Sequence, residues 1–204
     1  MSDDALAALA AADPDLARIM PVSTPLPDRS RPPGFETLAR IIVQQQVSLA
    51  SAAAIWSRLE AAIRPFDAET LLGHDETALR ALGLSRQKAL YLSHLSTLVA
   101  DGTLDLDALH RLDDEAAQAA LVAVKGVGRW TAEIYLMFAL GREDIWPAGD
   151  IALQEAIRIA KGLAERPKGR VMDDLAEPWR PHRAVAARLL WSYYRHVKGR
   201  AVAP

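Results

Sequence analysis

Residues Leu121–Glu133 have the sequence LVAVKGVGRWTAE, in which an apolar helix end runs into two glycines and then into a second helix. Gly126 and Gly128 are one residue apart, and glycine readily adopts positive φ and lets the backbone come close to a ligand. A helix that starts at Arg129 would present its first backbone N–H groups to such a ligand. That arrangement favours an anion, and a phosphate of a DNA backbone fits it well. On spacing alone, a glycine joint between two helices explains the stretch at least as well.

The rest of the chain shows the period of helices. Apolar residues recur at spacings of three and four, and no segment alternates with period two, so we predict an all-α protein. Asp13, Ser85 and Asp113 are expected to cap helix N-termini with their side-chain oxygens. The predicted helices are 3–12, 14–20, 35–46, 48–63, 75–82, 85–100, 113–123, 129–140, 150–161 and 182–198.

Two stretches interrupt this pattern. Residues 23–34, STPLPDRSRPPG, are rich in proline and serine, which predicts a linker or an ordered loop. Residues 165–170, ERPKGR, form a second break.

The charge of the chain is unevenly distributed. The 204 residues hold 24 Lys and Arg against 26 Asp and Glu, a net charge of −2 that by itself argues mildly against a nucleic-acid binder. Residues 1–150, however, hold 13 basic and 21 acidic residues, whereas residues 151–204 hold 11 and 5. The basic C-terminal part either faces an anion or is a solvated surface.

Cysteine is absent from the sequence. This excludes disulfides, thiolate zinc sites, a cysteine nucleophile and a cysteine-held iron–sulfur cluster. No apolar run reaches the roughly 18 residues of a membrane helix, and the N-terminal stretch is acidic where a secretory signal is basic. We therefore expect a soluble, cytoplasmic protein that binds no membrane.

The glycine-containing stretch resembles the helix-hairpin-helix signature of DNA repair proteins, apolar-x-G-apolar-G-x-x-T-A. Further matches follow in order along the chain, and together they resemble the DNA-3-methyladenine glycosylase II family. The matching blocks are GFETLARIIVQQQVSLASAAAIWSRL (34–59), GLSRQKALYLSHLSTLVADG (83–102), LVAVKGVGRWTAE (121–133), IWPAGD (145–150) and WRPHRAVAARLLW (179–191).

This resemblance implies a helix-hairpin-helix DNA glycosylase fold, with two helical subdomains flanking an active-site cleft. Residues 34–142 would form the subdomain that contains the hairpin. Residues 1–33, two helices and the Pro-rich segment, would pack on the second subdomain, which residues 143–204 complete. The chain would be a compact form without the N-terminal β domain of larger relatives.

Asp150 is the candidate catalytic residue. Taken alone, an aspartate before an apolar-periodic helix is an N-cap. The two roles are compatible, because a carboxylate held at a helix N-terminus can stabilise the positive charge that develops on a sugar when an N-glycosidic bond breaks. It can also orient the attacking water. The resemblance implies that Asp150 does this.

The position after the hairpin where related lyases carry an attacking lysine is Trp130 in this chain. Without that amine there is no Schiff base, so the resemblance implies a monofunctional hydrolase that leaves an abasic site. Lys125 lies inside the hairpin and is interpreted as a solvent-facing charge or a phosphate neighbour.

Trp130 and Trp191 match pocket tryptophans of the family, which would stack on a base rotated out of the duplex. Core packing is the other interpretation of Trp191, and it is the preferred one for Trp56. Ile134 stands in the pocket where a relative has an aromatic residue, which leaves the lesion preference open.

Gln46, with Gln45 beside it, matches the position that enters the minor groove and fills the gap left by the flipped base. Exposed capping glutamines are the alternative. The hairpin donors Gly126, Gly128 and Thr131, helped by Lys125, would bind a DNA phosphate.

By resemblance, the main-chain carbonyls of Val122, Val124 and Val127 would hold a monovalent cation, sodium or potassium, next to that phosphate. The five histidines show no metal-ligand spacing, so no transition metal and no other cofactor is expected. Neutralisation by Lys125, Arg129 and the basic C-terminal residues would be local, which predicts weak nonspecific DNA affinity with a shallow salt dependence.

The function expected from these features is hydrolysis of the N-glycosidic bond of alkylated bases, such as 3-methyladenine and 7-methylguanine, in double-stranded DNA by a monomer. This would initiate base excision repair. The alternatives are a related glycosylase for oxidised or mismatched bases and a DNA-binding module without catalysis.

Overall fold

The computed structural model describes residues 3–199, and within that range it contains only helices, turns and loops, which confirms the all-α prediction. None of these helices is both long and apolar enough to cross a membrane. The α-helices are α1 (Asp3–Ala12), α2 (Pro14–Ser23), α3 (Phe35–Gln44), α4 (Leu49–Ala62), α5 (Ala68–Leu72), α6 (Glu76–Ala81), α7 (Arg86–Ala100), α8 (Asp114–Val122), α9 (Arg129–Phe138), α10 (Ile151–Ala160), α11 (Arg170–Ala176) and α12 (Arg183–Lys198), with 3-10 turns η1 (Ala108–Arg111) and η2 (Glu177–Trp179).

The predicted N-caps are confirmed. Side-chain oxygens of Asp13, Ser85 and Asp113 accept hydrogen bonds from backbone N–H groups in the first turns of α2, α7 and α8. The first backbone N–H groups of a helix have no acceptor within the helix. Because the side chains supply these acceptors, they fix where each helix begins.

The helix predictions were wrong in three places. α2 continues to Ser23 although Pro21 lies inside it, and the hydroxyl of Ser23 donates to the Ile19 carbonyl at 2.8 Å. The helices α5 and α11 were not predicted. They have 5 and 7 residues, so each holds at most about two turns of apolar spacing, although the 6-residue α6 lies within the predicted helix 75–82.

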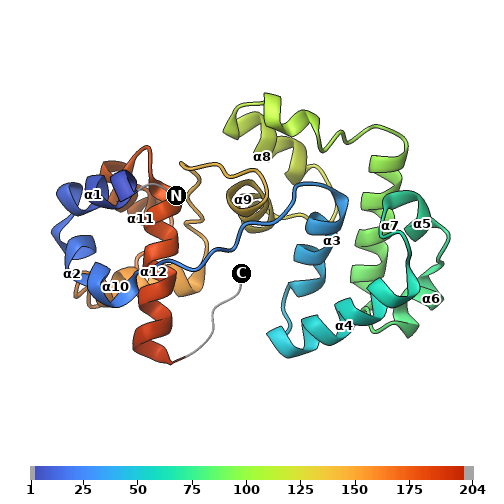
Figure 1. Ribbon diagram of the computed structural model, residues 1–204, viewed down its shortest axis with the longest axis horizontal. Helices are drawn as coiled ribbons and strands as arrows, with labels where there is room; N and C mark the ends of the chain where they lie inside the picture. The colour runs from blue at the N-terminus through green and yellow to red at the C-terminus, as the bar shows by residue number, and fades with distance from the viewer. Residues whose placement is uncertain (1–2, 200–204) are drawn as a thin grey trace. The chain divides into compact units, whose positions relative to one another are not determined.

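The chain forms two compact units. Unit 1 combines Met1–Arg29 with Gly141–Pro204, and unit 2 is the continuous segment Ser30–Leu140. In the structure the units change after Arg29 and after Leu140, a few residues before the predicted boundaries after residues 33 and 142. In Figure 1 the blue N-terminal helices α1 and α2 belong with the orange and red helices α10, α11 and α12.

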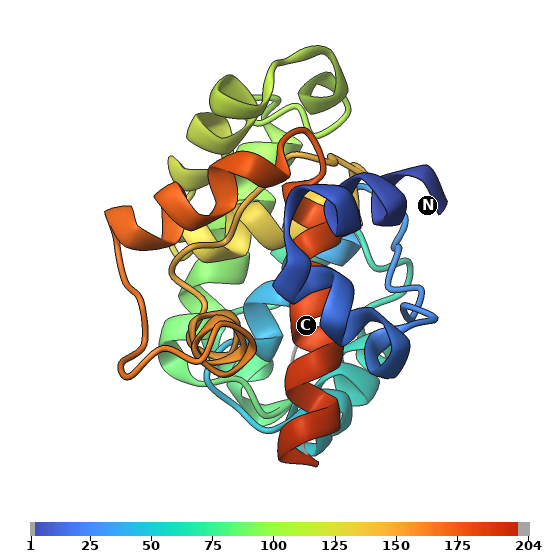
Figure 2. The ribbon, with the colours of Figure 1, turned by 90° about the vertical axis from the view of Figure 1, so that its left-hand side faces the viewer.

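Unit 1 is built around α12. This helix packs against α2 and α10, so the two ends of the sequence share one core, and Figure 2 shows the blue N-terminal helices lying across the red α12. Each of the three helices contributes fully buried aliphatic side chains, among them Leu16, Ile19, Ile157, Leu189 and Leu190.

Asp13 connects the start of α2 to the rest of unit 1. Its Oδ2 accepts hydrogen bonds from Lys161 Nζ at 2.6 Å and from Trp179 Nε1 at 3.0 Å. The carboxylate is 6% exposed, and these charge-assisted and neutral donors offset the cost of burying it.

Unit 2 has its core between α3, α4, α7 and α9. The neighbours α3 and α4, α3 and α7, and α3 and α9 are in contact. Trp56 of α4 is buried, and its ring centre lies 4.7 Å from that of Phe66. The Arg40 guanidinium lies 4.9 Å from the ring centre of Trp56. The interpretation of Trp56 as a core residue is thus confirmed.

The Pro-rich segment after Ser23 is an ordered loop. Within unit 1, Arg188 Nη2 donates to the Pro27 carbonyl at 2.8 Å. Within unit 2, Gly34 N donates at 2.8 Å to the hydroxyl of Tyr135, whose pKa is raised by burial. The loop is held by such bonds despite its lack of secondary structure.

Candidate active site and hairpin

The hairpin lies between α8 and α9 in unit 2. Gly126 has φ +93°, and a Cβ built on it would lie 2.2 Å from the ring of Tyr91 in α7. Both the backbone conformation and the close contact therefore require glycine at this position. Gly128 differs, because its φ is −82° and a Cβ built on it would meet nothing within 4 Å. The open space in front of Gly128 leaves its backbone accessible.

Gly128 is the N-cap of α9 and contributes no side chain there. The first backbone N–H groups of α9 point out of the helix end, as in any α-helix, and together with the dipole they favour an anion. Lys125 is exposed, in agreement with its interpretation as a solvent-facing charge. This geometry is compatible with a phosphate in front of the hairpin.

The positive charge of Arg129, which was predicted to help neutralise DNA, is paired with a carboxylate of the same helix. Its Nε donates to Glu133 Oε1 at 2.8 Å, and the Glu133 side chain is only 3% exposed whereas that of Arg129 is 69% exposed. Arg129 therefore compensates a buried carboxylate one helical turn away. The four-residue spacing of this pair is visible in the sequence, and it is the signal that could have predicted the contact.

Gln45 links the end of α3 to the hairpin. Its Nε2 donates to the Gly126 carbonyl at 3.1 Å and to the Thr131 hydroxyl at 2.9 Å. The Thr131 side chain is buried, so the donor that this residue can offer to a phosphate is its backbone N–H. Gln45 is thus turned toward the hairpin within unit 2.

Gln46 behaves differently from Gln45. It is exposed and has φ +54°, the single positive φ of a residue other than glycine in the described range. Val47 and Leu49 beside it are exposed apolar residues. Of the two glutamines, Gln46 is therefore the one that the corner between α3 and α4 presents to solvent.

Lys88 of α7 holds this corner in place, which the sequence analysis missed. Its Nζ donates to the Val43 carbonyl at 2.7 Å and to the Gln45 carbonyl at 2.6 Å, and burial lowers its pKa. These carbonyls belong to the C-terminal end of α3, where no helical donors remain. The block GLSRQKA identified Lys88 as part of a motif, but the sequence did not indicate which groups it contacts.

Asp150 is the N-cap of α10 in unit 1 and is 8% exposed. Its Oδ1 accepts hydrogen bonds from the backbone N–H of Leu153 at 2.7 Å and from Trp191 Nε1 at 3.1 Å. Two N–H donors thus stabilise the negative charge and fix the carboxylate's orientation. The cap predicted for Asp150 is confirmed.

Trp191 lies in the core of unit 1. It is 2% exposed and comes from the middle of α12, from which its indole N–H reaches Asp150. Core packing, one of the two interpretations of Trp191, is therefore present together with a direct contact to the candidate catalytic carboxylate. Whether its ring also meets a flipped base stays a prediction.

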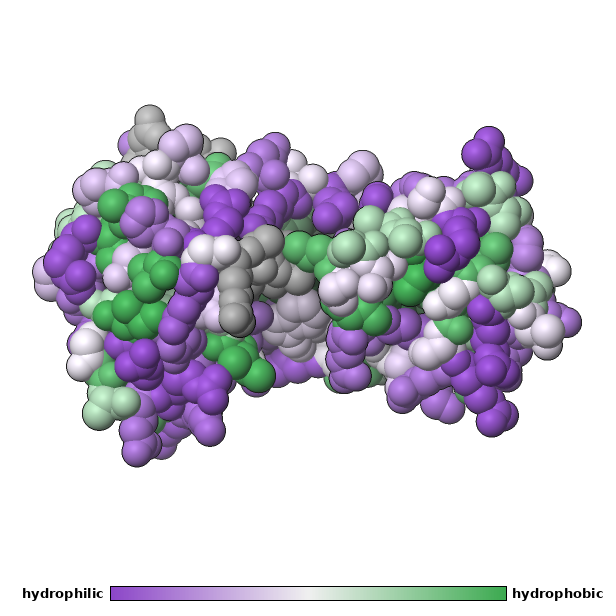
Figure 3. Space-filling view, turned by 90° about the horizontal axis from the view of Figure 1, so that it is seen from below, coloured by the Kyte–Doolittle hydropathy of each residue, from purple (hydrophilic) through white to green (hydrophobic). Residues whose placement is uncertain are grey.

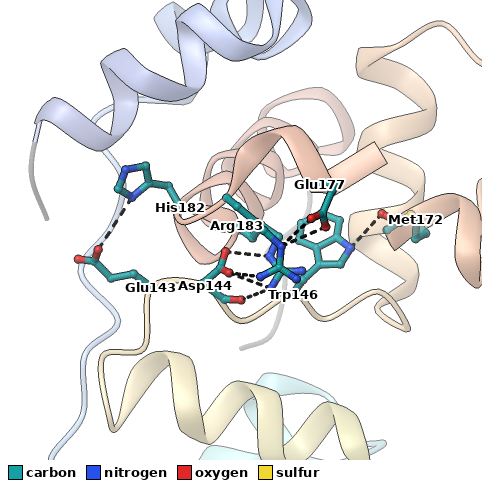
Figure 4. Close-up of polar contacts among 8 residues, drawn as sticks. Glu143, Asp144, Trp146, Met172, Glu177, His182 and Arg183 are labelled. Atoms are coloured by element: carbon teal, nitrogen blue, oxygen red, sulfur yellow. Dashed lines mark hydrogen bonds and ion pairs between the residues drawn. The ribbon is translucent and has the colours of Figure 1, made fainter. Parts of the chain in front are cut away.

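The loop that leads to Asp150 is fixed to the start of α12. Both carboxylate oxygens of Asp144 accept hydrogen bonds from Arg183, at 2.8 and 2.9 Å (Figure 4). Ala184 N donates to the Glu143 carbonyl at 2.9 Å. Further along the loop, Trp146 Nε1 donates to the Met172 carbonyl at 3.1 Å. The loop is therefore restrained at several points before it reaches the helix start.

Trp130 and Ile134 lie one turn apart on α9. Trp130 is half-buried and Ile134 is buried. Because residues four apart share a face of a helix, both side chains lie on one side of α9. Their assignment to a base pocket stays a prediction.

The proposed cation ligands are main-chain carbonyls at the end of α8 and in the hairpin turn. Val127 N donates to the Val124 carbonyl at 2.9 Å, so that oxygen can offer a cation only its second lone pair. The binding of a monovalent cation by these carbonyls stays a prediction. Within residues 3–199 no group of three or more His, Cys, Asp or Glu residues is arranged to hold a metal.

Comparison with known proteins begins from the sequence. Residues 39–181 match the family described as HhH-GPD superfamily base excision DNA repair protein. The protein YfjP of Bacillus subtilis is 32% identical over 77% of this chain, which spans 58% of the length of YfjP. DNA-3-methyladenine glycosylase 1 of Schizosaccharomyces pombe is 29% identical over 77% of this chain and 71% of its own length.

Solved structures agree with this result. DNA-3-methyladenine glycosidase of Bacillus halodurans has a TM-score of 0.82 and 31% identity, covering 93% of this chain and 88% of its own. The Schizosaccharomyces pombe 3-methyladenine DNA glycosylase Mag1, in complex with abasic DNA, has a TM-score of 0.83 and 27% identity, covering 94% and 95%. The family match spans well over half of the sequence, and the chain therefore belongs to the HhH-GPD superfamily of base excision DNA repair proteins.

Proposed function

We propose that this protein is a monofunctional DNA glycosylase that hydrolyses the N-glycosidic bond of alkylated bases, of the 3-methyladenine and 7-methylguanine type, in double-stranded DNA. The observation that carries the proposal is the buried Asp150 carboxylate at the start of α10, oriented by Leu153 N and Trp191 Nε1. The names of the relatives support the substrate class.

Asp150 acts electrostatically in this mechanism. As the bond between base and sugar breaks, positive charge develops on the sugar, and a fixed carboxylate beside it stabilises that charge without having to reorganise. The same carboxylate can accept a proton from the attacking water or orient it. Both donors hold Oδ1, so the orientation of the group is set before substrate binds.

Trp130 supports the monofunctional assignment. It stands where a lysine would attack the sugar in a lyase, and an indole cannot form a Schiff base. The product is therefore an abasic site with an intact strand. The indole face also attracts a cationic ring, such as a purine alkylated at N3 or N7, whose bond to the sugar is already weakened.

The hairpin and the corner before it serve as DNA contacts in the proposal. Backbone N–H groups around Gly126, Gly128 and Thr131 bind a phosphate, with Lys125 as a neighbouring charge, and Gln46 fills the space of the flipped base. A monovalent cation at the carbonyls of Val122, Val124 and Val127, when bound, adds positive charge beside that phosphate. The enzyme acts as a monomer, which size-exclusion chromatography with light scattering would test.

The decisive experiment is single-turnover release of bases from methylated duplex DNA, with Asp150→Asn compared with the wild type. Asparagine still caps a helix, so the fold is retained while the rate falls by about 10²–10³-fold. Asp75→Asn is the matched control, because Asp75 caps α6 in the same way through Ala78 N. Release of free 3-methyladenine or 7-methylguanine is expected, with alkali-labile sites left in the DNA.

Three results would contradict the proposal. The first is a wild-type rate in Asp150→Asn. The second is release of oxidised or mismatched bases without release of alkylated ones, which would indicate the related glycosylase. The third is binding to duplex DNA without any base release, which would indicate a binding module.

A further inference from the structure

Unit 1 carries a groove beside the start of α10. It consists of two adjoining hollows of about 420 Å³ each, which share Glu155 and Arg166 in their walls. One hollow extends to Arg158 and Lys168, and the other to Ile151 and Lys198. The walls come from α10, from the end of α12 and from the loop that follows α10, all within unit 1.

The loop after α10 supplies two uncompensated cations. Arg166 and Lys168 are exposed, whereas Pro167 between them is buried and anchors the loop. Within the described part of the chain, neither Arg166 nor Lys168 has a side-chain hydrogen bond or ion pair. Two positive side chains are thus held in the groove wall without a partner of their own.

The central carboxylate of the groove is already neutralised. Glu155 accepts hydrogen bonds from Arg158 Nε at 2.9 Å and Nη2 at 3.0 Å, and Lys198 Nζ lies 3.3 Å from its Oε1. Chiefly because of the hydrogen bonds from Arg158, the pKa of Glu155 is lowered to about 2. Glu155 therefore leaves the cations of the walls in excess, even when exposed Glu165 is included.

The groove also has an apolar part next to the candidate catalytic residue. Ile151 directly follows Asp150 and is 66% exposed, and half-buried Tyr194 lies in the same wall. On the face seen from below, hydrophobic residues (green) form patches among hydrophilic ones (Figure 3). An exposed isoleucine between cations suits a ligand in which the C–H faces of sugars alternate with phosphates.

We infer that this groove binds the sugar–phosphate backbone of the substrate duplex next to the damaged nucleotide. Arg166 and Lys168 contact phosphates, and Ile151 packs against the neighbouring sugar. The position relative to the damaged nucleotide rests on the proposed role of Asp150, which Ile151 follows directly. The contact with DNA itself rests on the excess of cations and on the shape of the groove.

The double variant Arg166→Ala/Lys168→Ala tests the inference. The probe is a fluorescent duplex with an abasic-site analogue, and its affinity is measured by anisotropy from about 50 to 200 mM salt. Loss of two phosphate contacts is expected to weaken binding roughly tenfold at low salt and to lower the slope of log affinity against log salt by about two.

Two further variants serve as controls. Arg80→Ala/Arg111→Ala removes the same charge from exposed sites of unit 2 and is expected to bind like the wild type. Arg166→Lys/Lys168→Arg keeps the charge and is expected to keep the salt slope.

The inference is overturned if the groove variant matches the Arg80/Arg111 control in affinity and slope. It is also overturned if the charge-keeping variant loses as much affinity as the alanine variant. A failure of the proposed glycosylase activity looks different, because the wild type would then bind the duplex without releasing a base.

Discussion

The indole N–H of Trp191 donates to Oδ1 of Asp150 at 3.1 Å, so that a residue in the middle of α12 orients the carboxylate at the start of α10. Both groups are buried in unit 1. Because the two positions are 41 residues apart, the orientation of the candidate catalytic group depends on the packing of α12. Trp191 is therefore a positioning residue in addition to any contact with a base.

Trp191→Phe should separate positioning from packing. Phenylalanine fills much of the same space but lacks the N–H, so we expect the rate of base release at saturating enzyme to fall by about tenfold. Thermal unfolding should show only a modest loss of stability. The matched control is Trp179→Phe, which removes a similar indole bond to the buried Asp13 and should lower stability without slowing base release. Equal rate losses in both variants would contradict the positioning role.

Gly126→Ala should chiefly lower stability, whereas Gly128→Ala should chiefly lower DNA affinity. At Gly126 the positive φ and the Tyr91 ring leave no room for a Cβ, so we expect a loss of about 2 kcal/mol or more in the free energy of unfolding. At Gly128 the backbone conformation is ordinary and the space is open, so only the smaller loss from replacing a glycine N-cap by alanine is expected. DNA affinity should nevertheless fall, because the added methyl group stands between the hairpin and a phosphate. Urea unfolding and duplex binding measure the two effects, and unchanged binding by Gly128→Ala would argue against the phosphate contact.

Lys88→Met should loosen the corner between α3 and α4. The variant removes the donor for the carbonyls of Val43 and Gln45, and we expect a loss of about 1–3 kcal/mol in the free energy of unfolding. Since the corner carries Gln45 and Gln46, binding of abasic duplex should weaken as well. Lys88→Arg keeps a donor and should recover part of both. Recovery of stability by Lys88→Arg without any recovery of binding would show that Lys88 does not position the corner for DNA.

Glu155 should contribute to the acid sensitivity of unit 1. Its pKa is lowered from 4.5 to about 2, chiefly by hydrogen bonds from Arg158, so the folded state favours the ionised form. The stabilisation is fully present above the unfolded pKa and is lost as pH falls from about 4.5 through about 2. Glu155→Gln should therefore be less stable than the wild type at neutral pH, with the difference shrinking over this acidic window. A difference that stays constant with pH in urea titrations would count against the pairing.

The sequence predicted those parts of the fold that depend on local pattern. The longer helices and the caps at Asp13, Ser85 and Asp113 follow from apolar spacing and from side chains that bond within three residues. The helices α5 and α11 were not predicted, and their shortness alone does not account for this, because the six-residue α6 was predicted. The helix predicted over residues 14–20 continues through Pro21 to Ser23.

At the candidate site, residue types could be predicted but their partners could not. Gln45 was grouped with Gln46 as a wedge, and its bonds to Gly126 and Thr131 span 81 and 86 positions. The contact of Lys88 with the end of α3 spans 43 or more. Such pairings arise only when helices pack. The pair of Arg129 and Glu133 could have been predicted from the sequence, because the two residues are one helical turn apart.

Unit 1 consists of two segments of the chain that are separated by unit 2, and this affects the order in which the units can fold during synthesis. Unit 2 is one continuous segment and can fold as soon as Leu140 has left the ribosome. Helices α1 and α2 are synthesised before unit 2, yet their packing partner α12 is synthesised after it. The apolar residues Leu16 and Ile19 therefore remain without this partner until α12 has been made, and the hydrogen bond from Trp191 to Asp150 can form only then.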